Sequence, residues 1–382
     1  MIVVKAPQNY LNEPGIVDRI GDYVAPFTRD HVMIITSPKA WQATRQAVDA
    51  SFDALGIVYQ RYFLTGECTA AAIASFTEQA LADDVALIIG IGGGKVLDTA
   101  KGIAESSGRL PLITVPTVAA TCAAWSPISV LYTADGTHLN SMPLQRTPEW
   151  VLVDSRIIAE TPVRFLKAGI VDSLAKWYEF EPYLRQDDSS LSLVLKAQAA
   201  RLAVDVFEQI GEEAVADNQA RRVTPALIKV VDAVIALAGM ANSMRDEVAR
   251  IGVAHGIHNS MTRHPDLHRF LHGELVGFGL VVQSLLDTPH APSRTRLLSL
   301  LKAFSTPLTL RELGIIDSVS ARAAQIAQGV NIAPSIAARL PFELNAERIE
   351  QTLLRVAGET PGHGVGMAND AAGMNEREGI RA

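Results

Sequence analysis

The sequence contains little that would suit a secreted, membrane-bound or nucleic-acid-binding protein. Only two cysteines, Cys68 and Cys122, occur among 382 residues, and they form no CxxC pair, which excludes a disulfide framework and fits a reducing compartment. The formal net charge of -7 and the lack of any dense lysine and arginine run argue against a nucleic-acid partner. No uninterrupted apolar run reaches membrane-spanning length and no signal peptide is recognisable, so we expect a cytoplasmic protein with no membrane partner.

The first part of the chain alternates strand-like and helical patterns. This alternation is typical of a parallel α/β sheet, and we expect an α/β domain over residues 1–162. Asp135 and Gly136 form a strong turn signal between two strand-like runs, which predicts an inserted hairpin. The predicted strands cover residues 31–36, 58–64, 85–92, 112–117 and 150–155, and the predicted crossover helices cover 39–55 and 69–83.

After Pro162 the pattern changes to long stretches of helical periodicity without comparable β-branched runs. A chain of this length exceeds what one hydrophobic core normally serves, so we expect a second, all-helical domain over residues 163–357. The segment 358–382 is rich in glycine, alanine and polar residues and offers no apolar face. We expect it to be a flexible tail, in which His363 has no role.

A glycine turn is the most specific local signal of the first part. A buried-looking strand runs directly into Gly92, Gly93 and Gly94, and an amphipathic helix follows. Such a turn lets backbone amides approach a phosphate at a helix N-terminus. It matches neither the Walker A motif nor the GxGxxG spacing, so both a phosphate site and a plain tight turn remain open. The next strand ends in a loop with hydroxyls at Thr114, Thr117 and Thr121, at the edge where open α/β sheets bind ligands.

Histidines cluster in the second part. Five of the nine fall between residues 255 and 272. His255 and His258 lie three residues apart on one helix face, and the polar stretch around Pro265 could fold back to bring His272 beside His255. Two histidines and a carboxylate suffice for a catalytic zinc-like site, although such clusters also occur on solvated surfaces, as His264 and His268 suggest.

Four motifs in order extend over nearly the whole chain except the tail: the glycine turn, PTVAAT, AGIVDSLAKWYE, and AHGIHN followed by LHGE. Together they resemble the metal-dependent, iron-containing type of alcohol dehydrogenase family, in its glycerol dehydrogenase-like branch. The resemblance implies a dehydroquinate synthase-like architecture, in which an N-terminal dinucleotide-binding domain faces a helical, metal-binding domain. One divalent ion would lie in the cleft between them, and the protein would be a homo-oligomer.

The same resemblance assigns roles to individual residues. It makes Asp172, His255 and His272 the metal ligands, and places His258 in the substrate pocket, either as a proton relay or as a buried histidine that orients its neighbour. The implied cofactor site has two parts. The pyrophosphate site comprises Gly92, Gly93, Gly94, Lys95 and Asp98, and the lining near the ribose and nicotinamide comprises Thr117, Ser126, Ile128 and Tyr132.

Two departures from the family pattern bear on metal and substrate. Iron-binding members carry a histidine four residues after the aspartate, where this chain has Lys176, so the resemblance favours a three-ligand zinc site over iron. Glycerol dehydrogenases carry an aspartate where this chain has Cys122. Losing an acid at 122 and gaining a base at 176 both favour an anionic substrate, and Lys176 could hold its carboxylate. Alternatively, Lys176 points to solvent or pairs with a structural carboxylate.

A third departure concerns the cofactor. Many NAD-using relatives place an aspartate after the first strand, where it binds the adenosine ribose, and here Ser37, Pro38 and Lys39 follow that strand. Serine and lysine would not repel a 2′-phosphate. The sequence therefore favours NADP(H), with NAD(H) possible.

The motifs around Cys122, Lys176 and His255 are most similar to the hydroxycarboxylate dehydrogenase A-like members, which reduce 2-oxo acids to 2-hydroxy acids. We therefore expect a small-molecule substrate and reversible hydride transfer, with Lys176 and His258 in the catalytic site. A glycerol or polyol dehydrogenase is the alternative within this class. Outside it, the alternatives are a dehydroquinate synthase-like lyase and a non-catalytic metal or nucleotide binder.

Overall fold

The computed structural model describes residues 2–108, 110–186, 190–248, 250–287 and 291–358. The predicted tail at 358–382, with His363, lies outside these residues apart from Gly358.

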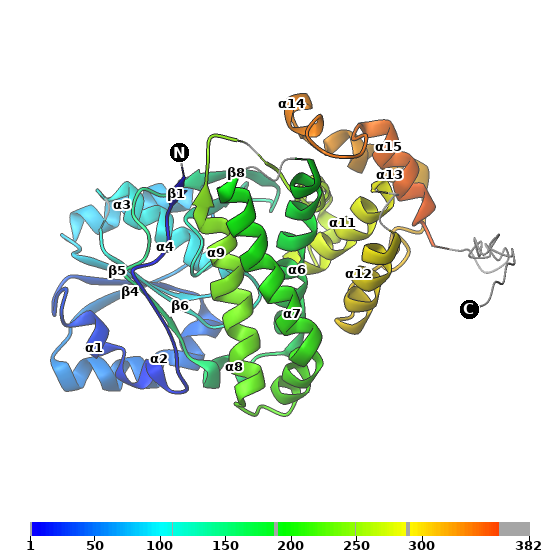
Figure 1. The fold of residues 1–382 in the computed structure, drawn as a ribbon. Coiled ribbons are helices and arrows are strands. Elements are labelled where there is room, and N and C mark those ends of the chain that lie inside the picture. The colour runs from blue at the N-terminus through cyan, green and yellow to red at the C-terminus, as the bar shows by residue number, and fades with distance from the viewer. Residues whose placement is uncertain (1, 109, 187–189, 249, 288–290, 359–382) are drawn as a thin grey trace, which may run out of the picture.

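The first part of the chain forms a six-stranded parallel sheet in the order β2-β9-β6-β5-β3-β4 (Figure 1). The parallel α/β prediction is therefore confirmed, and each of the five predicted strands is present. The edge strand β2 was not predicted, because four mostly polar residues carry no hydrophobic alternation. The strands are β2 (Asn9–Asn12), β3 (Val32–Thr36), β4 (Tyr59–Phe63), β5 (Leu87–Gly92), β6 (Leu112–Pro116) and β9 (Trp150–Val153).

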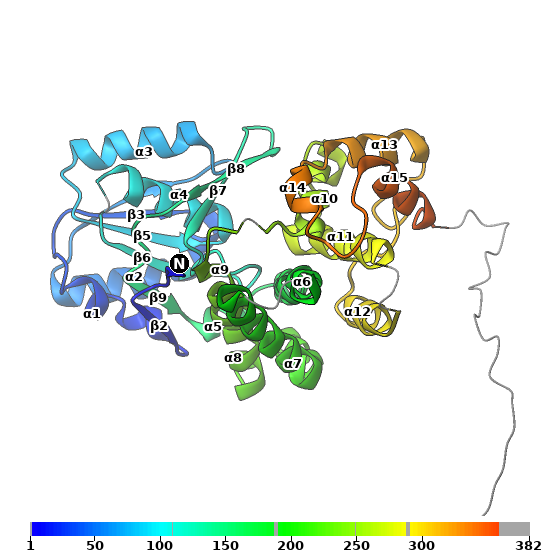
Figure 2. The ribbon, with the colours of Figure 1, turned by 45° about the horizontal axis from the view of Figure 1, so that its top comes forward.

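Helices cover both faces of this sheet, because its central strands are apolar on both sides. Ile34 and Ile89 face one layer of helices, and Met33 and Ile88 face the other. Figure 2 shows α3 and α4 on one side of the strands and α1 and α2 on the other. The helices are η1 (Ile16–Arg19), α1 (Gly21–Val24), α2 (Pro38–Leu55), α3 (Ala70–Ala82), α4 (Gly94–Ser106) and α5 (Ser155–Ala159).

Two small antiparallel pairs accompany the main sheet. The predicted hairpin is present as β7 (Ile128–Tyr132) and β8 (His138–Pro143), outside the parallel sheet. The other pair joins β1 (Val3–Val4) to β10 (Met244–Arg245), which lies in the part of the chain predicted to be all-helical. A two-residue strand leaves no periodic signal in the sequence, so pattern analysis does not detect it.

Apart from β10, the regular structure after residue 162 is helical wherever the chain is described. The predicted domain boundary falls in the short connection before α6, and the division into two domains there stays a prediction. The helices are α6 (Val163–Gln186), α7 (Leu191–Gln219), α8 (Pro225–Asp232), the π-helical turn η2 (Ala233–Leu237), α9 (Ala238–Ser243), α10 (Val253–Met261), η3 (Pro265–Leu267), α11 (His272–Leu286), α12 (Ala291–Ala303), α13 (Val319–Gly329), α14 (Pro334–Ala337) and α15 (Ala346–Arg355).

The run from α8 to α9, Pro225–Ser243, is long and apolar enough to cross a membrane by length and composition. However, 67% of its most apolar window is buried inside the protein. It packs against α7 and contributes Val230, Val234 and Ile235 to a core that also contains Val151 and Val153 of β9. The run is therefore a core element that joins the helices to the sheet.

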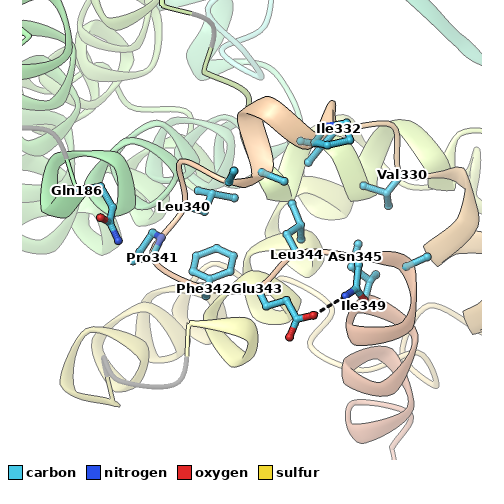
Figure 3. A pocket seen from close by; sticks show the side chains of 14 residues that line it. Gln186, Val330, Ile332, Leu340, Pro341, Phe342, Glu343, Leu344, Asn345 and Ile349 are labelled. Carbon is cyan, nitrogen blue, oxygen red and sulfur yellow. Dashed lines mark hydrogen bonds between the residues drawn. The ribbon is translucent and has the colours of Figure 1, made fainter.

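The C-terminal helices enclose a surface pocket of about 740 Å³ (Figure 3). It lies between the end of α6 and the segment that leads from α13 through α14 to α15. Apolar side chains dominate its lining, among them Ile332, Leu340, Phe342 and Leu344. This pocket is separate from the cleft described below.

Two glycines let α10 and α11 approach α6 closely. A Cβ atom on Gly273, in the first turn of α11, would lie 1.9 Å from the carbonyl oxygen of Ala168 in α6. A Cβ on Gly252, just before α10, would lie 2.0 Å from the Glu179 carboxyl group of α6. Only glycine fits at position 273, because the obstructing atoms are backbone, whereas a Cβ at position 252 would displace the Glu179 carboxyl group. The starts of α10 and α11 are thereby held against the middle of α6.

We predict that Gly273→Ala lowers the free energy of unfolding by about 1–3 kcal/mol, because α11 has to move away from the α6 backbone. Urea unfolding followed by circular dichroism measures this change. Gly66→Ala is the matched control, since a Cβ there meets nothing within 4 Å and stability should be nearly unchanged. Equal stability of the Gly273→Ala protein and the wild type would contradict the close packing of α11 on α6.

Candidate metal centre and cofactor cleft

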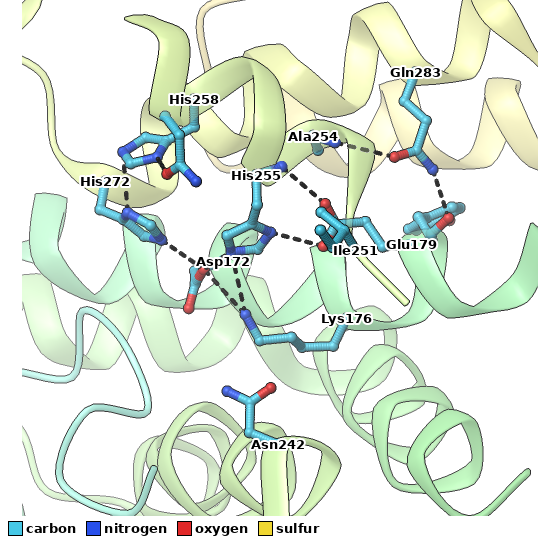
Figure 4. A network of polar contacts seen from close by, with 12 residues as sticks. Asp172, Lys176, Glu179, Asn242, Ile251, Ala254, His255, His258, His272 and Gln283 are labelled. Atoms are coloured by element: carbon cyan, nitrogen blue, oxygen red, sulfur yellow. Dashed lines mark hydrogen bonds and ion pairs between the residues drawn. The ribbon is translucent and has the colours of Figure 1, made fainter. Parts of the chain in front are cut away.

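Three helices bring one carboxylate and two imidazoles together. Asp172 comes from the middle of α6, His255 from the first turn of α10, and His272 from the first residue of α11 (Figure 4). Their ligand atoms all lie within 4.8 Å of one another. His255 Nε2 is 3.3 Å and His272 Nε2 is 3.2 Å from Asp172 Oδ1. The structure thus places together the three residues that the sequence proposes as metal ligands.

A buried glutamate orients the first histidine. Glu179 accepts hydrogen bonds from the backbone N–H of His255 at 2.9 Å and from its Nδ1 at 2.7 Å. With the Nδ1 proton held by Glu179, Nε2 is the atom directed at Asp172. Burial alone would lower the pKa of His255, but the charge of Glu179 and the hydrogen bonds to Asp172 and Glu179 together outweigh it and raise the pKa to about 9. Metal binding through Nε2 therefore has to release a proton.

A short hydrogen-bonded chain orients the second histidine. His258 Nδ1 lies 3.0 Å from Asn259 Oδ1, and His258 Nε2 lies 3.1 Å from His272 Nδ1. An amide oxygen can only accept, so the geometry is satisfied when His258 donates from Nδ1 and accepts at Nε2 from His272. That arrangement leaves the Nε2 lone pair of His272 facing Asp172. Burial, together with the two neighbouring histidines, holds the pKa of His258 well below its usual range.

Lys176 lies one turn after Asp172 on the same face of α6. Its Nζ is 3.4 Å from Asp172 Oδ1 and 3.4 Å from His255 Nε2, and the side chain is buried. Burial disfavours the ammonium, but the charge of Asp172, smaller contributions from Cys122 and Glu179, and the hydrogen bond to Asp172 together outweigh it and raise the pKa of Lys176. In turn, burial of Asp172 is outweighed by the Lys176 charge together with the close contacts of both histidines, so the pKa of Asp172 falls well below its usual range. Lys176 therefore faces the donor set and not the solvent.

The donor chemistry fits a divalent metal ion. Two imidazole nitrogens and one carboxylate oxygen form the three-ligand set that catalytic zinc sites use, and a fourth position stays free for water or substrate. Glu179 and the His258 side chain supply the outer hydrogen bonds that metal-bound histidines normally require. The site thus meets two conditions for metal binding, a suitable donor set and imidazole rings oriented by hydrogen bonds at their outer nitrogens.

The donor set opens on a cleft of about 950 Å³ that reaches to the carboxyl edge of the sheet. Gly93 is the N-cap of α4 and makes no side-chain capping bond, so the first N–H groups of that helix have no side-chain acceptor there. Cys122 is deeply buried and lines the same cleft, and its Sγ accepts a hydrogen bond from Asn242 Nδ2 at 3.4 Å. Predicted cofactor residues that line the cleft are Ser37, Gly93, Gly94, Lys95, Asp98, Ser126, Ile128 and Tyr132.

Gly92 and Thr117 are not among the residues that line the cleft. They join the ends of β5 and β6, because the Thr117 backbone N–H donates to the Gly92 carbonyl oxygen at 3.1 Å. Gly92 is packed against Val96, which a Cβ on the glycine would approach to 2.8 Å. Their position supports the turn that holds Gly93 and Gly94 in place.

Several cleft residues have partners that sequence reasoning missed. Asp98 pairs with the fully buried Lys101 at 2.7 Å, and Lys101 also donates to the backbone carbonyls of Ser126 and Ile128. This lysine therefore fixes the loop that lines the cleft. Lys95 pairs with Glu67. Glu179 was missed as well, although it lies seven residues after Asp172, a spacing that places both on one helix face and could have identified it.

Ser37 has a structural role that is visible in the fold. Its Oγ accepts a hydrogen bond from the Ala40 backbone N–H at 3.4 Å and caps α2. The same residue lines the cleft. The Ser37 hydroxyl thus caps α2 and also lies within reach of a ligand bound along the edge of the sheet.

Comparisons with known proteins agree with this geometry. Residues 7–155 match the iron-containing alcohol dehydrogenase family. The chain is 33% identical over 340 residues to hydroxycarboxylate dehydrogenase A of Escherichia coli (strain K12), covering 87% of this chain and 92% of that protein. It is 30% identical over 355 residues to glycerol dehydrogenase of Pseudomonas putida, covering 92% and 96%.

Solved structures give the same result. A probable glycerol dehydrogenase from Sinorhizobium meliloti 1021 superposes with a TM-score of 0.82 at 25% identity, covering 92% of this chain and 97% of that one. Glycerol dehydrogenase from Schizosaccharomyces pombe gives a TM-score of 0.82 at 29% identity, covering 93% and 90%. Because relatives at 30% identity or more match this chain over most of both lengths, the protein belongs to the iron-containing alcohol dehydrogenase family and is an oxidoreductase that acts on CH–OH groups.

Proposed function

We propose that the protein reduces small 2-oxo acids to 2-hydroxy acids with NADP(H), using one divalent ion held by Asp172, His255 and His272. Zinc is favoured over iron, because the position four residues after Asp172 carries Lys176. The observation that carries the proposal is the charge of the cleft beside the donor set. The Lys176 ammonium is buried there, and Cys122, whose thiol is neutral, lines the same cleft. Burial raises the pKa of that thiol, so it adds no negative charge.

Each residue has a defined part in this proposal. When bound, the ion supplies a Lewis acid for the substrate oxygen and the nicotinamide exchanges the hydride. Lys176 attracts the substrate carboxylate and so orients the adjacent carbonyl carbon. The buried walls around Asp172 exclude water from the reacting atoms. We assign His258 a positioning role toward His272, since both of its ring nitrogens are already engaged.

Glycerol dehydrogenase activity is the second candidate, and the relatives from Pseudomonas putida and Schizosaccharomyces pombe favour it. A polyol needs hydrogen-bond acceptors in the cleft. Asn242 offers one amide oxygen, but Cys122 contributes no carboxylate. A lyase of the dehydroquinate synthase type has no support among these relatives. We further propose that the protein is a cytoplasmic homo-oligomer.

We predict that His272→Ala abolishes metal-supported turnover, because the ion loses one of its donors. Activity after zinc loading and zinc content by atomic absorption are both measured. His264→Ala is the matched control, since His264 lies outside the cleft and should leave both quantities unchanged. Full activity of the His272→Ala protein in metal-free buffer would refute the ligand assignment.

We predict that Lys176→Met raises the KM for 2-oxobutyrate by at least about tenfold, the equivalent of about 1.4 kcal/mol. The physical reason is the loss of the charge that faces the substrate carboxylate. Steady-state rates on hydroxyacetone, which has no carboxylate, serve as the control in the same variant, and its KM should change little. An unchanged KM for 2-oxobutyrate would eliminate the role of Lys176.

We predict that the wild type has a higher kcat/KM for NADPH than for NADH, and that Ser37→Asp lowers this ratio by about tenfold or more through repulsion of the 2′-phosphate. Aspartate also caps helices well, so α2 should remain folded. Ser37→Asn is the neutral control of equal size. A wild type that uses NADH with much greater efficiency than NADPH would contradict the cofactor proposal.

A further inference from the structure

The cleft continues past the metal centre to a group of positive side chains that the proposed chemistry does not use. Phe180 lies one turn beyond Lys176 on α6, and Lys196 Nζ on α7 lies 5.3 Å from the centre of its ring. Arg245 in β10 and Arg250 in the segment before α10 line the same cleft. We call Lys196, Arg245 and Arg250 the cationic cluster.

The Arg250 side chain is buried, and three of the five N–H groups of its guanidinium have no partner. Its side chain is 2% exposed, and Nη1 donates to the Asp246 carboxylate at 2.8 and 3.0 Å. Nε and Nη2 are buried and have no hydrogen-bond partner. Buried polar groups without partners are uncommon, and an unoccupied ligand position is one of the usual reasons. Nε and Nη2 form one edge of the guanidinium, which is the fork that binds carboxylate or phosphate with two parallel hydrogen bonds.

Among the described residues, Asp246 is the carboxylate that forms an ion pair with the cationic cluster. Its oxygens already accept from Arg250, from Ser190 Oγ at 2.6 Å and from the Val248 backbone N–H at 3.0 Å. Burial and then the positive charge of Arg250 lower the pKa of Lys196 to about 8. Lys196 and Arg245 form no ion pair in the described part of the chain, so their ammonium and guanidinium groups are available to an anion in the cleft.

Arg250 also borders a second, smaller cavity of about 260 Å³, which Tyr183 and Gln186 of α6 line as well. The Tyr183 hydroxyl donates to the Ile251 carbonyl oxygen at 2.9 Å and holds the backbone beside Arg250 in place. Arg250 thus lines both cavities, while its Nε and Nη2 atoms are themselves buried. A fixed, desolvated guanidinium binds an anion more strongly than a mobile surface arginine does.

We propose that the cationic cluster binds an anionic group of the substrate, a carboxylate or a phosphate, at the end remote from the reacting carbon. This inference rests on the proposed function, because it takes the reacting carbonyl to lie at Asp172, His255 and His272. From Asp172 to Phe180 is two helical turns, about 12 Å along α6. Lys196 lies beside Phe180 and lines the cleft together with Arg250, so several bonds separate the remote anion from the carbonyl. 2-Oxo acids with a second acidic group are then preferred over short monocarboxylates.

Kinetics on two acids of equal chain length test this directly. 2-Oxoadipate and 2-oxohexanoate differ only by the terminal carboxylate. We expect the wild type to prefer 2-oxoadipate by about tenfold or more in kcat/KM, mainly through KM, which corresponds to about 1.4 kcal/mol. The Lys196→Met/Arg245→Met protein should lose this preference while its kcat/KM for 2-oxohexanoate stays the same. Lys302→Met, an exposed lysine on α12 outside the cleft, is the control.

A second variant tests the guanidinium fork. Arg250→Lys keeps a positive charge for Asp246 but removes the Nε and Nη2 edge, so the preference for 2-oxoadipate should fall while circular dichroism shows a folded protein. A wild type without any preference between the two acids, or variants that keep the full preference, would overturn the proposal.

A binding measurement separates this inference from the proposed reaction. Calorimetric titration with adipate or with inorganic phosphate requires no turnover, and comparison of the two shows which anion the cluster takes. Binding by the wild type that Lys196→Met/Arg245→Met abolishes would support the cluster even if neither 2-oxo acid were reduced. Reduction of both 2-oxo acids at equal kcat/KM, with no binding of either anion, would leave the proposed function intact and refute the cluster.

Discussion

The site depends on one buried carboxylate. Asp172 lies in the middle of α6 and is 2% exposed, and a negative charge at such depth is stable only with close positive partners. Lys176 Nζ supplies that compensation at 3.4 Å, and the Nε2 atoms of His255 and His272 lie 3.3 and 3.2 Å from the same carboxylate oxygen. A divalent ion would supply it more strongly, because it places two positive charges against the same oxygen. The starts of α10 and α11 are therefore fixed against α6 by electrostatics as well as by the close contacts at Gly252 and Gly273.

The same logic extends along the cleft. From the glycine turn to β10, the lysine and arginine side chains of the cleft lining differ in how closely they are paired with carboxylates. Lys95 is paired with Glu67, and Lys101 with Asp98, so their charges are already compensated. Lys176 shares its carboxylate with two histidines, and Arg250 shares Asp246 with Ser190 and Val248. Among the described side chains that line the cleft, Lys196 and Arg245 are the cations without an ion pair, so the positive charge open to an anionic ligand lies beyond the metal centre.

Sequence patterns predicted the architecture well where the signal is periodic. The buried parallel strands read as β-branched runs, and the hairpin at Asp135 and Gly136 has strong turn chemistry. The sequence also indicated that His255 and His272 could meet, since the stretch around Pro265 could fold the chain back. The edge strand β2 and the two-residue β10 were not predictable, because their pairing partners lie far away in the chain and they carry no periodic pattern of their own.

Side-chain partnerships were harder to predict than elements. Glu179 could have been found from its helical spacing to Asp172. Lys101, by contrast, donates to backbone carbonyls of a loop more than twenty residues away. Arg250 can be recognised as a candidate binding residue only from the two cavities that it lines. Such relations depend on tertiary packing of helices and loops, which local spacing does not encode.

The most direct test of this account is the initial rate of the zinc-loaded protein on 2-oxobutyrate with NADPH, compared with its rate on glycerol with NADP⁺ or NAD⁺. The account predicts turnover of the 2-oxo acid and little or none of glycerol. Efficient oxidation of glycerol without reduction of the 2-oxo acid would contradict it, and would mean that Lys176 and Cys122 do not select an anionic substrate.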